Sequence, residues 1–186
     1  CFHVVVGAGN VGLAELNGFT ITKGNAVPFS PQFINGFAIK AEEGGAIHLN
    51  TASPAIVNCI IRDNYAIFGS GIHTYNLAAT LNIDSCTFLN NKSQNLGAAL
   101  KFEKGSGTGN VEVKNCNFKA NISNGNGGVA CIHGVPARFI NCLASGNRIG
   151  SNNQGIFHVM MNATATFDNC TIAGNAGVSG CSAIYI

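Results

Sequence analysis

Apolar and polar residues alternate in short stretches along the chain, and these stretches recur at a regular interval. Residues 44–50 read Gly-Gly-Ala-Ile-His-Leu-Asn, and related phrases begin at positions 69, 97, 127, 154 and 181. Alternation with a period of two is typical of a strand that buries one face. The pattern therefore predicts that Ile47 and Leu49 point into a core, while His48 and Asn50 point outward.

A second phrase carries a cysteine, and its five copies place the cysteines 27, 30, 26 and 28 residues apart. The alternation slips by one at the residue before each cysteine, and these residues are Asn58, Ser85, Asn115, Asn141 and Asn169. Asn tolerates the left-handed backbone conformation that a sharp bend between two short strands requires. Each copy then ends in an asparagine: Asn64, Asn91, Asn121, Asn147 or Asn175.

The two phrases together describe one coil of about 27 residues, made of strand, turn, strand, bend, short strand and loop. The Leu-x-x-Leu-x-Leu signature of leucine-rich repeats is missing, and no segment has a long amphipathic helical stripe. The sequence therefore predicts an all-β, single-stranded parallel β-helix of about six coils. Its core would hold ladders of Ile, Val, Phe and Cys, with stacked asparagines at the turns.

The five phrase cysteines should form a ladder of buried thiols: Cys59, Cys86, Cys116, Cys142 and Cys170. Equivalent residues of adjacent coils lie about 4.8 Å apart with parallel side chains, whereas a disulfide needs Cβ atoms about 3.8 Å apart. The chain has no Cys-x-x-Cys pair and the ladder lies in the core, so no metal site is predicted. Cys1, Cys131 and Cys181 fall off the ladder and are candidates for exposure.

The run from Gly44 to Cys59 resembles the right-handed parallel β-helix repeats of bacterial surface proteins. That group includes the polymorphic outer-membrane proteins, with Gly-Gly-Ala-Ile and Phe-x-x-Asn motifs, and pectate-lyase-like extracellular proteins. The resemblance covers nearly the whole chain except residues 26–43. It implies the right-handed coil and a secreted or bacterial cell-surface location, associated with the outer membrane.

Length and charge limit the remaining possibilities. The 186 residues are enough for one domain, residues 1–186, and the repeat leaves no room for a second fold. Ten basic and eight acidic residues give a net charge of +2, which provides no electrostatic footprint for nucleic acid. No apolar run is long enough for a membrane span. Both ends of the chain read as strand, which indicates a fragment of a longer protein or a unit that associates end to end.

Residues 26–43 interrupt the repeat and are predicted to form a loop excursion from the first coil. Phe29, Phe33 and Phe37, together with two prolines, indicate an ordered segment. The aromatic rings would cover the side of the first coils. The alternative is a binding loop, because long loops on a rigid scaffold often carry function.

The outward positions of the first phrase form the candidate site. Stacking the coils places in one column His48, His73, Lys101, Cys131, His158 and Tyr185, and in the next Asn50, Tyr75, Glu103, His133 and Met160. The first column is predicted to be an exposed binding face. Residues of the two columns are close enough on successive coils to reach one another.

The resemblance to pectate-lyase-like proteins implies that such a face could be a shallow polysaccharide groove. Lys101 or His133 would then take a proton next to a uronate carboxyl group, and Tyr75 would return it, with Glu103 beside them. Against this, Glu103 stands alone in its column, and Glu42 and Glu43 are expected on the loop side. A hydrolase would need a pair of carboxylates. The simpler interpretation is that these positions are ordinary polar surface.

Three functional hypotheses follow. The first is a structural or adhesive module that binds glycan or a surface protein. The second is a carbohydrate-active enzyme, a lyase or glycoside hydrolase, that uses the Lys101, Glu103 and His133 face. The third is a unit that self-associates end to end. No cofactor is predicted for any of them.

Overall fold

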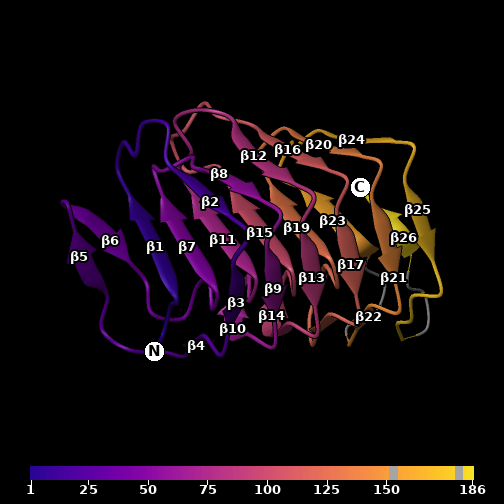
Figure 1. Cartoon of the computed structure of the whole chain (residues 1–186). Coiled ribbons are helices and arrows are strands. Elements are labelled where there is room, and N and C mark those ends of the chain that lie inside the picture. The colour runs from indigo at the N-terminus through magenta and orange to yellow at the C-terminus, as the bar shows by residue number, and fades with distance from the viewer. Residues whose placement is uncertain (151–154, 179–181) are drawn as a thin grey trace.

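The computed structural model describes residues 1–150, 155–178 and 182–186, which form a parallel β-solenoid. The chain makes about five turns of about 28 residues each, slightly fewer than the six coils predicted. Figure 1 shows the coils stacked side by side in chain order, from the N-terminal to the C-terminal end. The described residues contain no helix, and therefore none that is long and apolar enough to cross a bilayer.

Every coil contributes strands to the same parallel sheets. The first sheet holds β1 (Val5–Ala8), β7 (Ile47–Asn50), β11 (Ile72–Tyr75), β15 (Leu100–Glu103), β19 (Ala130–His133), β23 (Gly155–Met160) and β26 (Ser182–Tyr185). The second holds β2 (Glu15–Asn17), β8 (Ala55–Val57), β12 (Leu81–Asp84), β16 (Val111–Lys114), β20 (Ala137–Ile140) and β24 (Ala165–Asp168).

The third sheet carries the residues that follow each cysteine. It holds β3 (Thr20–Thr22), β9 (Ile60–Arg62), β13 (Thr87–Leu89), β17 (Asn117–Lys119), β21 (Leu143–Ser145) and β25 (Thr171–Ala173). The prediction of three strands per coil missed a fourth, short sheet. That sheet holds β4 (Asn25–Ala26), β10 (Tyr65–Phe68), β14 (Lys92–Leu96), β18 (Ile122–Ser123) and β22 (Arg148–Ile149).

Small and apolar side chains fill the interior of the coils in ladders, as predicted. Phe88 and Phe118 are fully buried on adjacent coils, and their rings stack with centroids 4.9 Å apart. Four of the predicted ladder thiols, Cys59, Cys86, Cys116 and Cys142, are buried free cysteines, and Cys170 is half-buried at the end of the ladder. The core is therefore a set of stacked like residues, in which the spacing of the coils sets the spacing of the side chains.

The bend before each cysteine has the left-handed backbone that the sequence predicts. The φ angles are 52° at Asn58, 54° at Ser85, 53° at Asn115, 54° at Asn141 and 52° at Asn169. Ser85 therefore takes the same conformation as the four asparagines. The bend turns the chain from the second sheet into the third and lets the cysteine side chain point inward.

The closing asparagines form a hydrogen-bonded ladder between coils. The side-chain amide of Asn64 donates to Oδ1 of Asn91 at 3.0 Å, and Asn91 donates in the same way to Asn121 at 3.0 Å. The ladder continues to Asn147 and Asn175 at 2.9 Å each. Each inner asparagine thus satisfies its buried polar groups on the neighbouring coils, which favours one register of stacking.

The segment that interrupts the repeat leaves the coil between β4 and β7 and forms an antiparallel hairpin, β5 (Gln32–Ile34) and β6 (Phe37–Ile39). The side-chain amide of Asn50 donates to the carbonyl of Ala38 at 2.9 Å, and Phe37 packs against Gly9. The hairpin therefore lies beside β1 and β7 at the N-terminal end of the solenoid (Figure 1). The prediction that its aromatic residues cover the coils is wrong for Phe29 and Phe33, which are 64% and 72% exposed.

Candidate functional site

The register of the first sheet confirms both predicted columns. His48 pairs with His73, His73 with Lys101, and Lys101 with Cys131 on successive coils. Cys131 pairs in turn with His158, and His158 with Tyr185. In the neighbouring column the partners run in the order Asn50, Tyr75, Glu103, His133 and Met160.

The expectation that the first column forms an exposed face is wrong for most of its members. His48, His73, Lys101, Cys131 and His158 are all buried, and only Tyr185 is exposed. The segments ahead of the strands turn back over the outer face of the sheet. A Cβ at Gly44 would lie 2.9 Å from the Cβ of His48, and a Cβ at Gly69 3.0 Å from those of His73 and Lys101. Phe68 also covers Lys101, whose Nζ lies 5.4 Å from the ring centroid.

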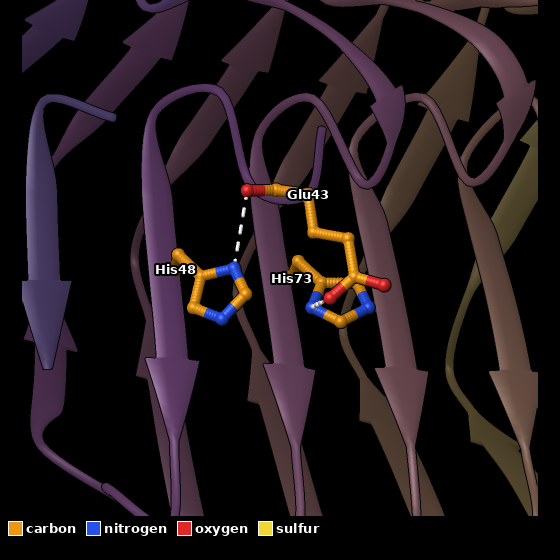
Figure 2. A group of neighbouring side chains, drawn as sticks. All are labelled: Glu43, His48 and His73. Carbon is orange, nitrogen blue, oxygen red and sulfur yellow. Dashed lines mark hydrogen bonds and ion pairs between the residues drawn. The ribbon is translucent and has the colours of Figure 1, made fainter. Parts of the chain in front are cut away.

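Glu43 occupies the centre of this covered region, although the sequence placed it on the loop side. It is only 5% exposed and lies between β6 and β7, just before Gly44. Its carbonyl oxygen accepts a hydrogen bond from Nδ1 of His48 at 3.1 Å. Figure 2 shows the Glu43 side chain extending from this point to the ring of His73 on the next strand.

The imidazoles of His48 and His73 lie side by side on β7 and β11 (Figure 2), with ring centroids 5.2 Å apart and an interplanar angle of 27°. Burial lowers the pKa of each ring to about 4, so both are neutral at pH 7. His3 continues the row, with its centroid 5.3 Å from that of His48. Burial also lowers the pKa of His3.

Two ion pairs flank the histidines. Lys40 Nζ lies 3.1 Å from Oε1 of Glu43, on the side that faces the excursion. Lys101 Nζ pairs with Oε2 of Glu103 and lies 3.4 Å from Nε2 of His73. Hydrogen bonding with His73 and pairing with Lys101 lower the pKa of the Glu103 carboxyl group, in spite of its partial burial. Each carboxylate therefore has a lysine partner, and the group as a whole is close to electrically neutral.

A cavity of about 230 Å³ opens beside this group. Its lining includes Lys40, Glu43, His48 and Tyr75, together with Ala38 and Asn50. Lys40 Nζ lies 5.9 Å from the centroid of the Tyr75 ring. The cavity has room for a few water molecules or a small ion, but not for a segment of polysaccharide.

The structure brings together only some of the predicted catalytic residues. Lys101 and Glu103 are in contact, but Lys101 is 4% exposed, and its ammonium group is held against Glu103 and His73. His133 is half-buried and adjacent to Glu103 in the register. Among the described residues, no hydrogen bond or ion pair joins His133 to Lys101 or Glu103. The catalytic role assigned to Lys101, Glu103, His133 and Tyr75 stays a prediction.

The off-ladder cysteines differ from one another. Cys1 is exposed, whereas Cys131 is fully buried in the first column, so the prediction of exposure is wrong for Cys131. Burial raises the pKa of its thiol to about 11. Cys181 lies outside the described residues. The binding roles predicted for Cys131, His158 and Tyr185 stay predictions.

Within the described part of the chain, Glu43, His48 and His73 form a group whose side chains suit a metal ion. One potential ligand atom from each lies within 4.8 Å of the others. Sequence reasoning looked for zinc ligands among the cysteines and missed Glu43. A signal was present, because Glu43 precedes the glycine of its repeat at the position that Phe68 and Leu96 occupy in the next two coils. A carboxylate at a position that is apolar in the next two coils points to a specific role.

The chain matches no family model, no curated protein and no solved structure with which it was compared.

Proposed function

We propose that this chain is a structural and adhesive module, a stiff solenoid that presents its N-terminal excursion to a protein partner. The exposed, uncharged aromatic surface of that excursion carries the proposal. Phe29, Phe33 and Ile34 are exposed there, and residues 26–39 contain no Asp, Glu, Lys or Arg.

Aromatic residues are enriched and charged residues depleted at the centres of protein interfaces. Phe29 also stacks on Phe2, with ring centroids 5.5 Å apart, so that its ring is held in place before a partner binds. A side chain that is already ordered loses less conformational entropy on binding. These features suit the centre of an interface with a protein partner.

The solenoid supports the structural half of the proposal. Continuous parallel strands and the asparagine ladder connect each coil to its neighbours. A scaffold of this kind holds a loop in a fixed position. We place the module outside the cell or on a bacterial surface, because its repeat motifs resemble those of bacterial surface proteins.

The test is a binding screen against arrays of extracellular proteins and of glycans, with three forms of the chain. We expect the wild type and Phe19→Ser to bind a protein ligand equally, because Phe19 is exposed but lies outside the excursion. The double variant Phe29→Ser/Phe33→Ser should bind at least about tenfold more weakly, as loss of interface anchors predicts. Binding to glycans alone, equal binding by all three forms, or no binding would overturn the adhesive proposal.

The carbohydrate-active enzyme is the alternative function, and the covered face makes it the less favoured one. A polysaccharide would have to displace the segments over Lys101 before a proton could be transferred. The decisive assay incubates the chain with plant, algal and host polysaccharides and records product size and unsaturated-uronate absorbance. Cleavage that is lost in Lys101→Ala and His133→Ala would establish the enzyme. End-to-end self-association stays a prediction.

A further inference from the structure

We propose that Glu43, His48 and His73 form a binding site for a single zinc ion, or a similar borderline divalent cation, on the outer face of the first sheet. The site would connect the end of the excursion to strands β7 and β11. It does not depend on the proposed adhesive role, and it differs from the sequence-based prediction, which included no metal site.

The donor set suits zinc. Two imidazole nitrogens and one carboxylate oxygen, with a water molecule as the fourth ligand, are a common zinc environment. One ligand atom from each residue lies within 4.8 Å of the others. Zinc bonds of about 2.0–2.2 Å in a tetrahedral shell would place neighbouring ligand atoms about 3.4 Å apart. The three side chains therefore need to close slightly around the ion, and the flexible Glu43 side chain can supply most of that movement.

A buried nitrogen without a partner is the second observation. His48 is 1% exposed, and its Nε2 makes no hydrogen bond. Its Nδ1 lies 3.1 Å from the Glu43 carbonyl oxygen, which requires the proton on Nδ1 and leaves the Nε2 lone pair free. Metal-bound histidines are commonly oriented by such a bond from the other ring nitrogen to a backbone carbonyl. An unpaired buried acceptor is costly, and a metal ion would remove that cost.

His73 offers the third ligand, on the side of its ring that faces Glu43. Its Nδ1 lies 3.4 Å from Oε2 of Glu43, without the geometry of a hydrogen bond. Its Nε2 lies 3.7 Å from Oε2 of Glu103. Nε2 also lies 3.4 Å from Lys101 Nζ, which can only donate, so zinc would have to select the tautomer that carries the proton on Nε2 and directs it to Glu103. Nδ1 would then present a lone pair toward Glu43 and the proposed ion.

The neighbouring cavity provides access and a place for water. The cavity of about 230 Å³ borders both Glu43 and His48. Lys40 now pairs with Glu43, but its own side chain is 52% exposed and is free to swing outward when a cation replaces it. The other nearby ammonium group, Lys101, is already paired with Glu103, which reduces its repulsion of a cation at the His73 end.

The experiment adds zinc chloride to the folded chain and measures binding by calorimetry and thermal stability by circular dichroism. A Cys1→Ser background removes the exposed thiol as a competing ligand. We expect one zinc ion per chain and a rise of several degrees in the unfolding midpoint. Glu43→Gln and His48→Gln should each weaken zinc binding by at least about tenfold and abolish the rise.

His158→Gln is the matched control, because His158 is a buried histidine of the same column that lies outside the group. Its zinc binding should equal that of the parent. A wild-type measurement covers the case in which a variant fails to fold: in ¹H–¹⁵N spectra of the imidazoles, zinc should shift His48 and His73 and leave His158 unchanged. Absence of binding at millimolar zinc, unchanged binding in folded Glu43→Gln and His48→Gln, or shifts of other histidines instead would overturn the proposal.

Discussion

Asn91 and Asn121 are thirty residues apart in the chain, yet one oxygen of Asn121 accepts two hydrogen bonds from Asn91. The backbone N–H and the side-chain amide of Asn91 both donate to Oδ1 of Asn121 at 3.0 Å. The Asn121 amide in turn donates to the Phe88 carbonyl at 3.0 Å. One buried side chain thus satisfies donors and an acceptor on the adjacent coil, so its removal affects more than one hydrogen bond.

We therefore predict that Asn121→Ala lowers the free energy of unfolding by about 3 kcal/mol, because each buried polar group left unpaired costs about 1–3 kcal/mol. Urea denaturation followed by circular dichroism measures the change. Asn82→Ala, at an exposed position of β12, is the control and should change stability by less than about 0.5 kcal/mol. Equal effects of the two substitutions would show that the ladder adds little to stability.

The stacked rings of Phe88 and Phe118 lead to a second prediction. Phe118→Ala should lower the free energy of unfolding by about 3–5 kcal/mol, because the closely packed coil cannot collapse into the space that remains. Phe19→Ala removes the same side chain from a position that is 56% exposed and should cost less than about 0.5 kcal/mol. Both variants are compared by chemical denaturation, and similar losses would contradict the proposed packing.

The buried histidines predict a loss of stability in acid. His48 and His73 have pKa values of about 4 in the folded chain and ordinary values near 6.5 when unfolded. Between these limits the unfolded chain binds more protons, so stability is complete above pH 6.5 and falls as the pH drops toward 4. The loss is of the order of 3 kcal/mol for each ring. The charged side chains that face the rings of His48 and His73 are Lys40, Glu43, Lys101 and Glu103.

Urea titrations in the presence of a chelator at pH 7, 6, 5 and 4 measure this dependence without a bound metal. His48→Gln should reduce by about half the slope of the free energy of unfolding against pH between pH 6.5 and 4. The reason is that His48 is one of the two groups whose proton binding differs most between the folded and the unfolded chain in this pH range. Further loss below pH 4.5 is expected from Glu103, whose pKa is lowered in the folded chain. A stability curve that is flat from pH 7 to 5 would contradict the burial of neutral imidazoles.

Thiol accessibility gives a fourth prediction. Alkylation of the native chain with iodoacetamide at pH 8 should modify Cys1 and leave Cys131 and Cys142 unmodified. Burial raises the pKa of both latter thiols to about 11, which leaves little thiolate to react. Peptide mapping identifies the modified sites, and the denatured chain serves as the reference for full reactivity. Rapid native modification of Cys131 would show that the outer face of the first sheet is open.

The elements that the sequence predicted well depend on repeated, local signals. The bend residues Asn58 and Ser85 and the closing Asn64 recur at equivalent places in each coil, so the register of the strands followed from their spacing. The fourth sheet was missed because strands such as Ile122–Ser123 are too short to show an alternation. The burial of Lys101 was missed because Phe68 and Gly69, on the preceding coil, cover it.

The amino-acid sequence by itself determined the solenoid and the order of the columns on its first sheet. This was possible because stacking equivalent coils converts sequence spacing directly into neighbours in space. Only the tertiary structure decided which columns are covered. The position of Glu43 against His48 and His73 depends on the path of a non-repeating excursion, for which periodicity provides no information. The buried polar group therefore arises where the excursion rejoins the repeat.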